Sequence, residues 1–169
     1  MKRYTMGGAM SIAEQAAFDI EHFLNENEAT IEVTNVEYEI EFQEKDIDLL
    51  WRYRTNSGEK TVTIEIKGDR YHRTGNYFFE TISNDQKNTP GCFMYTEADY
   101  VFYYFLEQRE LHILPMPTTR DWFILNLDQF PESATSTEHK GKFLYRTIGR
   151  LVERKRVKNE VTDVRIINI

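Results

Sequence analysis

The sequence predicts an α/β (α+β) protein, in which helices accompany a β-sheet, and three observations carry this prediction. Residues 46–67 contain two runs of alternating apolar and polar residues around the turn Asn56-Ser57-Gly58, which is the pattern of an antiparallel hairpin. Residues 11–14, Ser-Ile-Ala-Glu, match a helix capping box that precedes apolar residues at helical spacing. Residues 100–105, Tyr-Val-Phe-Tyr-Tyr-Phe, are strongly β-prone and predict a buried strand.

Composition limits the class of protein. A chain of 169 residues with 40% hydrophobic residues predicts a single domain over residues 11–169, preceded by a flexible N-terminus at residues 1–10. No apolar run approaches the roughly 20 residues that span a bilayer, and the N-terminus lacks an apolar signal core. Cys92 is the only cysteine, which excludes an internal disulfide and a cysteine zinc cluster, and it is expected to be buried and inert. We therefore expect a cytoplasmic protein with no membrane partner.

Charge is distributed unevenly along the chain. The net charge of −7 argues against indiscriminate binding of polyanions. Residues 14–48 nevertheless hold twelve acidic residues and one base, Lys45, whereas residues 140–158 hold eight bases and one acid, Glu153. This polarity allows an acidic protein to present one basic face.

The expected elements of the first half follow in chain order. The first helix begins at Ser11 and ends near Asn25, with Ala13, Ala16, Ile20 and Phe23 or Leu24 on its buried face. Residues 36–42 alternate apolar residues with glutamates and predict a half-buried strand. The hairpin follows, with strands at 46–54 and 61–67.

The second half is less regular. Residues 77–83 are apolar but short, so that either a strand or a helix fits them. After the strand at 100–105, residues 111–114 are its expected hairpin partner. Thr119 is expected to cap a helix that continues through Phe130. The remaining expected elements are a Ser/Thr-rich loop at 132–139, a helix at 142–157 and a terminal strand at 161–169.

The hairpin brings together side chains that can act on a phosphate. Alternation along the second strand places Glu65 and Lys67 on one face, and Asp48 begins the partner strand beside them. Two carboxylates and an ammonium at one sheet edge can hold a divalent cation and act on a phosphodiester. The ordinary alternative is a set of cross-strand ion pairs with no catalytic role.

Asp48 with Glu65-Ile66-Lys67 resembles the core motif of the PD-(D/E)xK nuclease superfamily, the restriction-endonuclease-like fold. The resemblance extends to Gln43 followed by Asp46-Ile47-Asp48, which is similar to a lead-in that often reads Gly-Ile-Asp. Thr74-Gly75-Asn76 followed by Glu80 is similar to a segment downstream of the motif, and Pro90-Gly91 and 98–101 resemble the lead-in to the next strand. The resemblance covers about residues 11–115, and Ile47 stands where the family name has proline.

The resemblance implies a restriction-endonuclease-like mixed central β-sheet flanked by helices, with Mg²⁺ (or Mn²⁺) as the cofactor. Asp48, Glu65 and the carbonyl of Ile66 would bind the metal, and a helix glutamate, Glu21, would join them. Lys67 would assist the attacking water. Asp46 shares the face of Asp48 and is expected at the rim of the site. Glu80 and Asn76 are weaker candidates, because a purely structural role also explains each of them.

Basic residues identify candidate surfaces for DNA, the expected partner. Lys142, Arg146, Arg150 and Arg154 recur every four residues and are expected to form a stripe along the helix at 142–157. Arg70 and Arg73 lie in a polar loop and form a second candidate surface. The leading hypothesis is a metal-dependent nuclease that acts as a monomer or as a homodimer. The alternatives are a non-catalytic nucleic-acid-binding module of the same fold and a protein-interaction domain.

Overall fold

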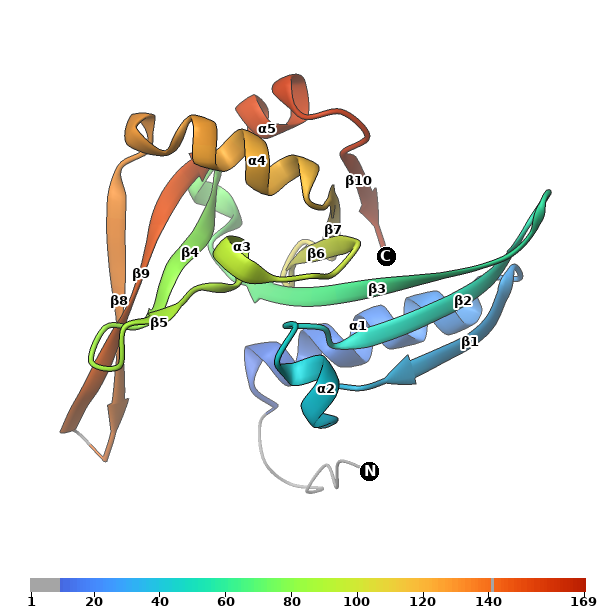
Figure 1. The fold of residues 1–169 in the computed structure, drawn as a ribbon, viewed down its shortest axis with the longest axis horizontal. Coiled ribbons are helices and arrows are strands. Elements are labelled where there is room, and N and C mark those ends of the chain that lie inside the picture. Colours follow the sequence, from blue (N-terminus) through green and yellow to red (C-terminus); the bar gives the residue numbers. More distant parts are fainter. Residues whose placement is uncertain (1–9, 141) are drawn as a thin grey trace.

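The computed structural model describes residues 10–140 and 142–169, and their strands form two sheets (Figure 1). The six-stranded sheet has the order β1 (Thr30–Asn35), β2 (Leu49–Thr55), β3 (Gly58–Asp69), β6 (Tyr100–Phe105), β7 (Glu110–Pro115) and β10 (Arg165–Asn168). The four-stranded sheet has the order β5 (Thr89–Pro90), β4 (Asn76–Asn84), β9 (Lys142–Glu153) and β8 (Glu132–His139). Residues 1–9 of the expected flexible N-terminus lie outside the described residues.

Helices accompany both sheets, so the predicted mixture of helices and a mixed sheet is confirmed. They are α1 (Ile12–Glu26), α2 (Ile40–Gln43), α3 (Cys92–Tyr95), α4 (Thr118–Leu125) and α5 (Arg154–Glu160), with 3₁₀ turns η1 (His72–Thr74) and η2 (Leu127–Gln129). The six-stranded sheet is mixed because β3 pairs in parallel with β6, whereas its other neighbouring strands are antiparallel.

Helix α1 forms as predicted. The Ser11 hydroxyl accepts a hydrogen bond from the Glu14 amide at 3.2 Å, and the Glu14 carboxylate accepts one from the Ser11 amide at 2.9 Å. These bonds satisfy two amides that the first turn leaves without helical partners. Ala16, Ile20 and Leu24 are fully buried and fix the helix against the six-stranded sheet.

The hairpin of β2 and β3 is also confirmed. Leu49 pairs with Ile64 at one end and Thr55 with Gly58 at the turn. Leu49, Val62 and Ile64 are buried beneath α1. Strand β3 is longer than predicted and runs to Asp69, which carries Glu65 and Lys67 past the start of β2.

The strand predicted at 36–42 is wrong. Strand β1 ends at Asn35, whose side-chain oxygen accepts a hydrogen bond from the Glu37 amide at 3.2 Å and begins a turn into α2. Of the alternating apolar residues, Val36 is buried, but Tyr38 and Ile40 are 61% and 75% exposed. The alternation therefore does not mark a buried face.

The helix predicted at 142–157 is wrong as well, and so is the loop at 132–139. Both segments are strands, β9 and β8, and α5 begins only at Arg154. A spacing of four residues fits either element, because residues i and i+4 share one face of a strand as well as of a helix. Residues 142–153 form a strand because they pair with β4 on one side and with β8 on the other.

The remaining predictions of the second half are met more closely. Residues 77–83, which fitted a strand or a helix, belong to β4, and the predicted hairpin at 100–114 is β6 and β7. Helix α4 and η2 cover most of the helix predicted at 119–130. Thr119 does not cap it: Pro117 occupies the cap position, and the Thr119 hydroxyl donates to the Pro115 carbonyl at 2.7 Å. The predicted terminal strand is the shorter β10.

Candidate active site

The structure brings Asp48, Glu65 and Lys67 together at the end of β3. The Lys67 Nζ lies 3.1 Å from Glu65 Oε1, and Glu65 is only 4% exposed. Asp48 precedes β2, and its Oδ2 accepts a hydrogen bond from the Ile66 amide at 2.8 Å. The Asp48 amide in turn donates to the Ile64 carbonyl at 2.9 Å. The start of one strand and the end of its partner are thus joined through Asp48, which is the arrangement that the hairpin predicted.

Burial dominates the electrostatics of the two carboxyl groups. It raises the pKa of Glu65 well above its usual value, the Lys67 ammonium opposes this, and the nearby Asp48 raises it further. Burial also raises the pKa of Asp48, although the hydrogen bond from the Ile66 amide favours its charged form. Asp48 and Glu65 line the same small cavity, so that a cation in this cavity would lie next to both carboxyl groups.

Lys67 is held among acidic groups. Its Nζ lies 4.0 Å from Glu80 Oε1 on β4 in addition to its contact with Glu65. Burial alone would lower the pKa of Lys67, but the surrounding Cys92, Glu65 and Glu80 raise it well above its usual value. The ammonium therefore stays charged, and it links the two sheets at this point.

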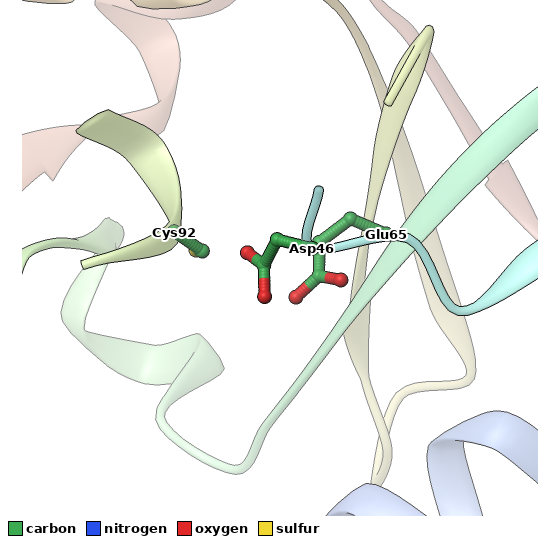
Figure 2. A group of neighbouring side chains, drawn as sticks. All are labelled: Asp46, Glu65 and Cys92. Atoms are coloured by element: carbon green, nitrogen blue, oxygen red, sulfur yellow. The ribbon is translucent and has the colours of Figure 1, made fainter. Parts of the chain in front are cut away.

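Asp46, which the sequence predicted at the rim of the site, is half-buried and lies in the turn that precedes Asp48. Its φ of 55° falls in the left-handed region that glycine favours, and Asp46 stands where the resembling pattern often has glycine. Ligand atoms of Asp46, Glu65 and Cys92 all lie within 4.8 Å of one another. Figure 2 shows the two carboxylates side by side, with the Cys92 side chain facing Asp46.

The donor set fits a metal ion. Within residues 10–140 and 142–169, the buried Asp46 Oδ2 has no hydrogen-bond partner. A buried carboxylate oxygen without a partner is costly unless a cation or a proton satisfies it, and burial indeed raises the pKa of Asp46. Asp48, Asp46 and Glu65 offer oxygen donors, the ligands that Mg²⁺ and Mn²⁺ prefer, whereas the Cys92 sulfur is a softer ligand.

Sequence reasoning missed the position of Cys92. It is buried, as expected, but it lies in this site because α3 begins immediately after Gly91. A β-carbon on Gly91 would lie 2.4 Å from the backbone carbonyl atoms of Glu80, so only glycine permits this approach of α3 to β4. The Pro90-Gly91 pair was the available signal, although it did not reveal the partner strand.

Two cavities have Lys67 in their lining, and several other predicted site residues line one or the other. A cavity of about 170 Å³ is lined by Asp48, Glu65, Ile66 and Lys67 together with Asn35. Glu21 does not line it; its Oε1 accepts a hydrogen bond from Asn35 at 2.7 Å. A second cavity, of about 320 Å³, is lined by Lys67 together with Glu80, Asn76 and Arg70.

The predicted basic stripe does not form on a helix, and three of its members are engaged by acidic groups. Arg146 Nε lies 2.9 Å from Asp85 Oδ2, and Arg150 lies 3.5 Å from Glu132 Oε2. Arg154 lies 3.5 Å from Glu110 Oε1, donates to the His72 carbonyl at 2.7 Å and stacks over Phe105. The exposed bases among the candidates are Lys142, Arg70 and Arg73, and Arg146 is exposed as well.

Comparison with known proteins identifies no relative: no family model, no curated protein and no solved structure matches this chain. In the part of the chain that the structure describes, no helix is long and apolar enough to cross a membrane.

Proposed function

We propose that this chain is a divalent-metal-dependent nuclease that hydrolyses phosphodiester bonds of DNA. The observation that carries the proposal is the convergence of Asp48, Glu65 and Lys67, with Asp46 and its unpartnered carboxylate oxygen beside them. The position of these residues within a mixed sheet that α1 covers supports the resemblance to PD-(D/E)xK nucleases.

The proposed roles follow from the chemistry of each group. Asp48, Glu65 and the Ile66 carbonyl would hold Mg²⁺ or Mn²⁺, with Asp46 as a further oxygen donor. When bound, such an ion polarises a phosphate and lowers the pKa of a water molecule. Lys67 presents a compact charge with three donors, and it orients the attacking water or stabilises charge that develops on the phosphate. Glu80 fixes the Lys67 ammonium from β4.

The burial of these acidic side chains favours a catalytic function over a binding module or a protein-interaction domain. Carboxylates taken out of water destabilise a fold unless partners or a cation compensate them. A protein-interaction domain or a binding module that only contacts the DNA backbone gains nothing from Glu65 at 4% exposure or from an unpartnered oxygen on Asp46. A metal site makes use of both features.

A cleavage assay with matched variants tests the proposal. Wild-type protein is incubated with plasmid and with labelled oligonucleotides in Mg²⁺ or Mn²⁺, and with EDTA as the metal-free control. Glu65→Gln and Asp48→Asn should abolish cleavage, whereas Glu59→Gln, at an exposed position of the same strand, should retain it. Cleavage that persists in EDTA, or in the Glu65→Gln protein, would exclude this mechanism.

A further inference from the structure

The larger cavity is lined by residues of both sheets, and it shares Lys67 with the smaller cavity that Asp48 lines. Its volume is about 320 Å³, and its walls come from the end of β3 and the segment after it, from β4, β8 and β9, and from single residues of α1 and β6. Most of its lining is apolar, with hydroxyl, amide and guanidinium groups from Ser133, Thr135, Asn76 and Arg70. An apolar pocket of this size with a few polar groups is a common form of ligand site.

The four-stranded sheet provides one wall of the cavity. Glu80 on β4 and Ser133 on β8 both pair with Gly149 on β9, so the centre of this row carries no side chain. The Phe78 ring lies over the gap, because a β-carbon on Gly149 would be 2.8 Å from Phe78 Cε2 and Cζ. Half-buried Phe78 therefore exposes part of an aromatic ring to the cavity.

Hydrogen bonds fix this wall relative to β3. The Phe78 amide donates to the Tyr103 hydroxyl at 3.0 Å, and that hydroxyl donates to Asp69 Oδ2 at 2.5 Å. Asp69 is the last residue of β3, two positions after Lys67. The cavity is thus held in a constant position beside the candidate active site.

Lys67 and Glu80 belong to both the cavity and the candidate site. A group in the cavity therefore lies next to a phosphate that is positioned at Lys67. Arg70, exposed at the cavity, can contact a neighbouring phosphate. These surroundings fit a flat, mostly apolar ring that has a polar edge and is attached to a phosphate.

We propose that this cavity holds one unpaired nucleotide, with its base against Phe78 and its phosphate toward Lys67 and Arg70. This inference rests on the proposed nuclease function and specifies its substrate: single-stranded nucleic acid, or a strand that is unpaired at the cleavage point. Bases of single strands bind aromatic rings in this way without sequence preference. An enzyme that encloses its target nucleotide must act on a single strand or extract the nucleotide from the duplex.

Size and charge argue against a continuous duplex at this point. The cavity cannot admit a double helix, whose major groove alone is about 12 Å wide. Of the predicted basic stripe, Arg150 and Arg154 are half-buried and paired with acidic groups, so fewer of its members can contact duplex phosphates. Affinity for duplex DNA depends mainly on such contacts.

Binding in EDTA separates this inference from cleavage. The probes are a fluorescein-labelled oligothymidylate of about 15 nucleotides, within the span of a single-strand site, and a labelled duplex of equal length. Fluorescence anisotropy at constant salt should show tighter binding of the single strand. Phe78→Ala should weaken that binding by about 5- to 150-fold, the range that loss of one stacked base implies.

A matched pair of variants on β8 tests the location. Ser133→Leu fills the cavity, whereas Ala134→Leu adds the same side chain at an exposed position on the opposite face of the strand. Only Ser133→Leu should weaken single-strand binding, by at least about tenfold if the base must enter. Equal affinities of the two variants, tighter binding of the duplex, or no binding of either probe would overturn the inference.

Cleavage measured in Mg²⁺ or Mn²⁺ distinguishes the two proposals. If Ser133→Leu cuts duplex and single strand as well as wild type does, the proposed nuclease function is supported and the proposed nucleotide site is excluded. If no substrate is cut but Ser133→Leu still loses single-strand binding selectively, the nucleotide site is supported and the nuclease function is excluded.

Discussion

Glu65 is the residue at which burial and charge conflict most directly. Its carboxyl group is almost inaccessible to water, contacts Lys67 and lies beside two other acids, Asp48 and Asp46. Because its pKa in the folded protein exceeds the unfolded value, burial of Glu65 is favourable while it is protonated and becomes unfavourable as it ionises. The stability of the metal-free protein should therefore depend on this one residue.

We predict that Glu65→Gln melts at a higher temperature than wild type in EDTA at pH 7 to 8. The stabilising contribution of protonated Glu65 is present below the unfolded pKa of about 4.3 and is lost as pH rises through the raised folded pKa. The difference between the two proteins should accordingly shrink toward pH 4. Thermal melts across this range measure it, with Glu59→Gln as the control for loss of one negative charge. A wild-type protein that is the more stable at pH 8 would contradict the prediction.

His112 predicts a second pH dependence, of the opposite sign. It is 1% exposed; its Nε2 lies 2.6 Å from Glu110 Oε1 and its Nδ1 lies 2.6 Å from the Tyr77 hydroxyl. Burial lowers the pKa of His112, although Glu110 opposes this. The unfolded chain therefore binds a proton more readily, and stability is lost as pH falls from about 6.5 through the lowered folded pKa.

Replacement of the imidazole tests this dependence. His112→Gln should be less stable than wild type at pH 7.5, because it leaves Tyr77 or Glu110 without a well-placed partner. It should also lose less stability between pH 7 and pH 5. Urea unfolding at several pH values provides the measurement, and parallel pH profiles for the two proteins would exclude His112 as the titrating group.

Among the elements, α3 has only four residues, yet it completes the site by placing Cys92 beside Asp46 and Glu65. Phe93 on the same turn stacks on Phe79, with ring centroids 3.7 Å apart, and anchors the turn in the core. The turn approaches β4 so closely that Gly91 lies against the backbone of Glu80. The position of Glu80, and through it that of Lys67, therefore depends on the absence of a side chain at Gly91.

Gly91→Ala is predicted to destabilise the protein by about 1–3 kcal/mol, as overpacking does, because the obstacle is backbone and cannot rotate away. Metal-dependent cleavage should fall as well, since α3 must move away from β4. Thr89→Ala, at an exposed position nearby, should change neither property. Chemical denaturation and the cleavage assay together measure both effects, and unchanged stability would show that the turn is not tightly held.

Elements defined by local pattern could be predicted, whereas those defined by distant partners could not. Alternation and a glycine turn identified β2 and β3, and a capping box identified the start of α1, because neighbouring residues determine each of these features. Strand β9 was mistaken for a helix, because its identity depends on pairing with β4 and β8 rather than on its spacing. For the same reason Asp48, Glu65 and Lys67 could be brought together in advance, whereas Cys92, which arrives on α3, could not.

For the whole molecule, the arrangement of basic residues changes which surface should meet nucleic acid. Arg146 and Arg150, the central residues of the predicted basic stripe, are paired with Asp85, which follows β4, and with Glu132 on β8. Exposed Arg70 and Arg73 lie between β3 and β4, and Arg70 lines the larger cavity together with Lys67.

We therefore predict that Arg70→Ala with Arg73→Ala lowers the affinity for DNA and flattens its salt dependence by up to about two units, since each phosphate contact contributes roughly 0.7–0.9. The matched double variant Arg146→Ala with Arg150→Ala should leave the salt slope unchanged. Titration of one labelled DNA at several salt concentrations compares them. The reverse result would place the nucleic acid on the four-stranded sheet.

The pairing of β4 with β9 has a consequence for synthesis of the protein. Asn76 pairs with Glu153, so β4 leaves the ribosome long before the strand that covers one of its edges exists. Until then the nascent chain carries Phe78 and Phe79 on an open strand edge, a form that is prone to aggregation. The hairpin of β2 and β3 has local partners and can form early, whereas the wall that holds Glu80 must wait for residues 142–153. Asp48 and Glu65 should thus come together in the growing chain before Glu80 is held in place beside Lys67. Chaperones that shield apolar strands would act during that interval.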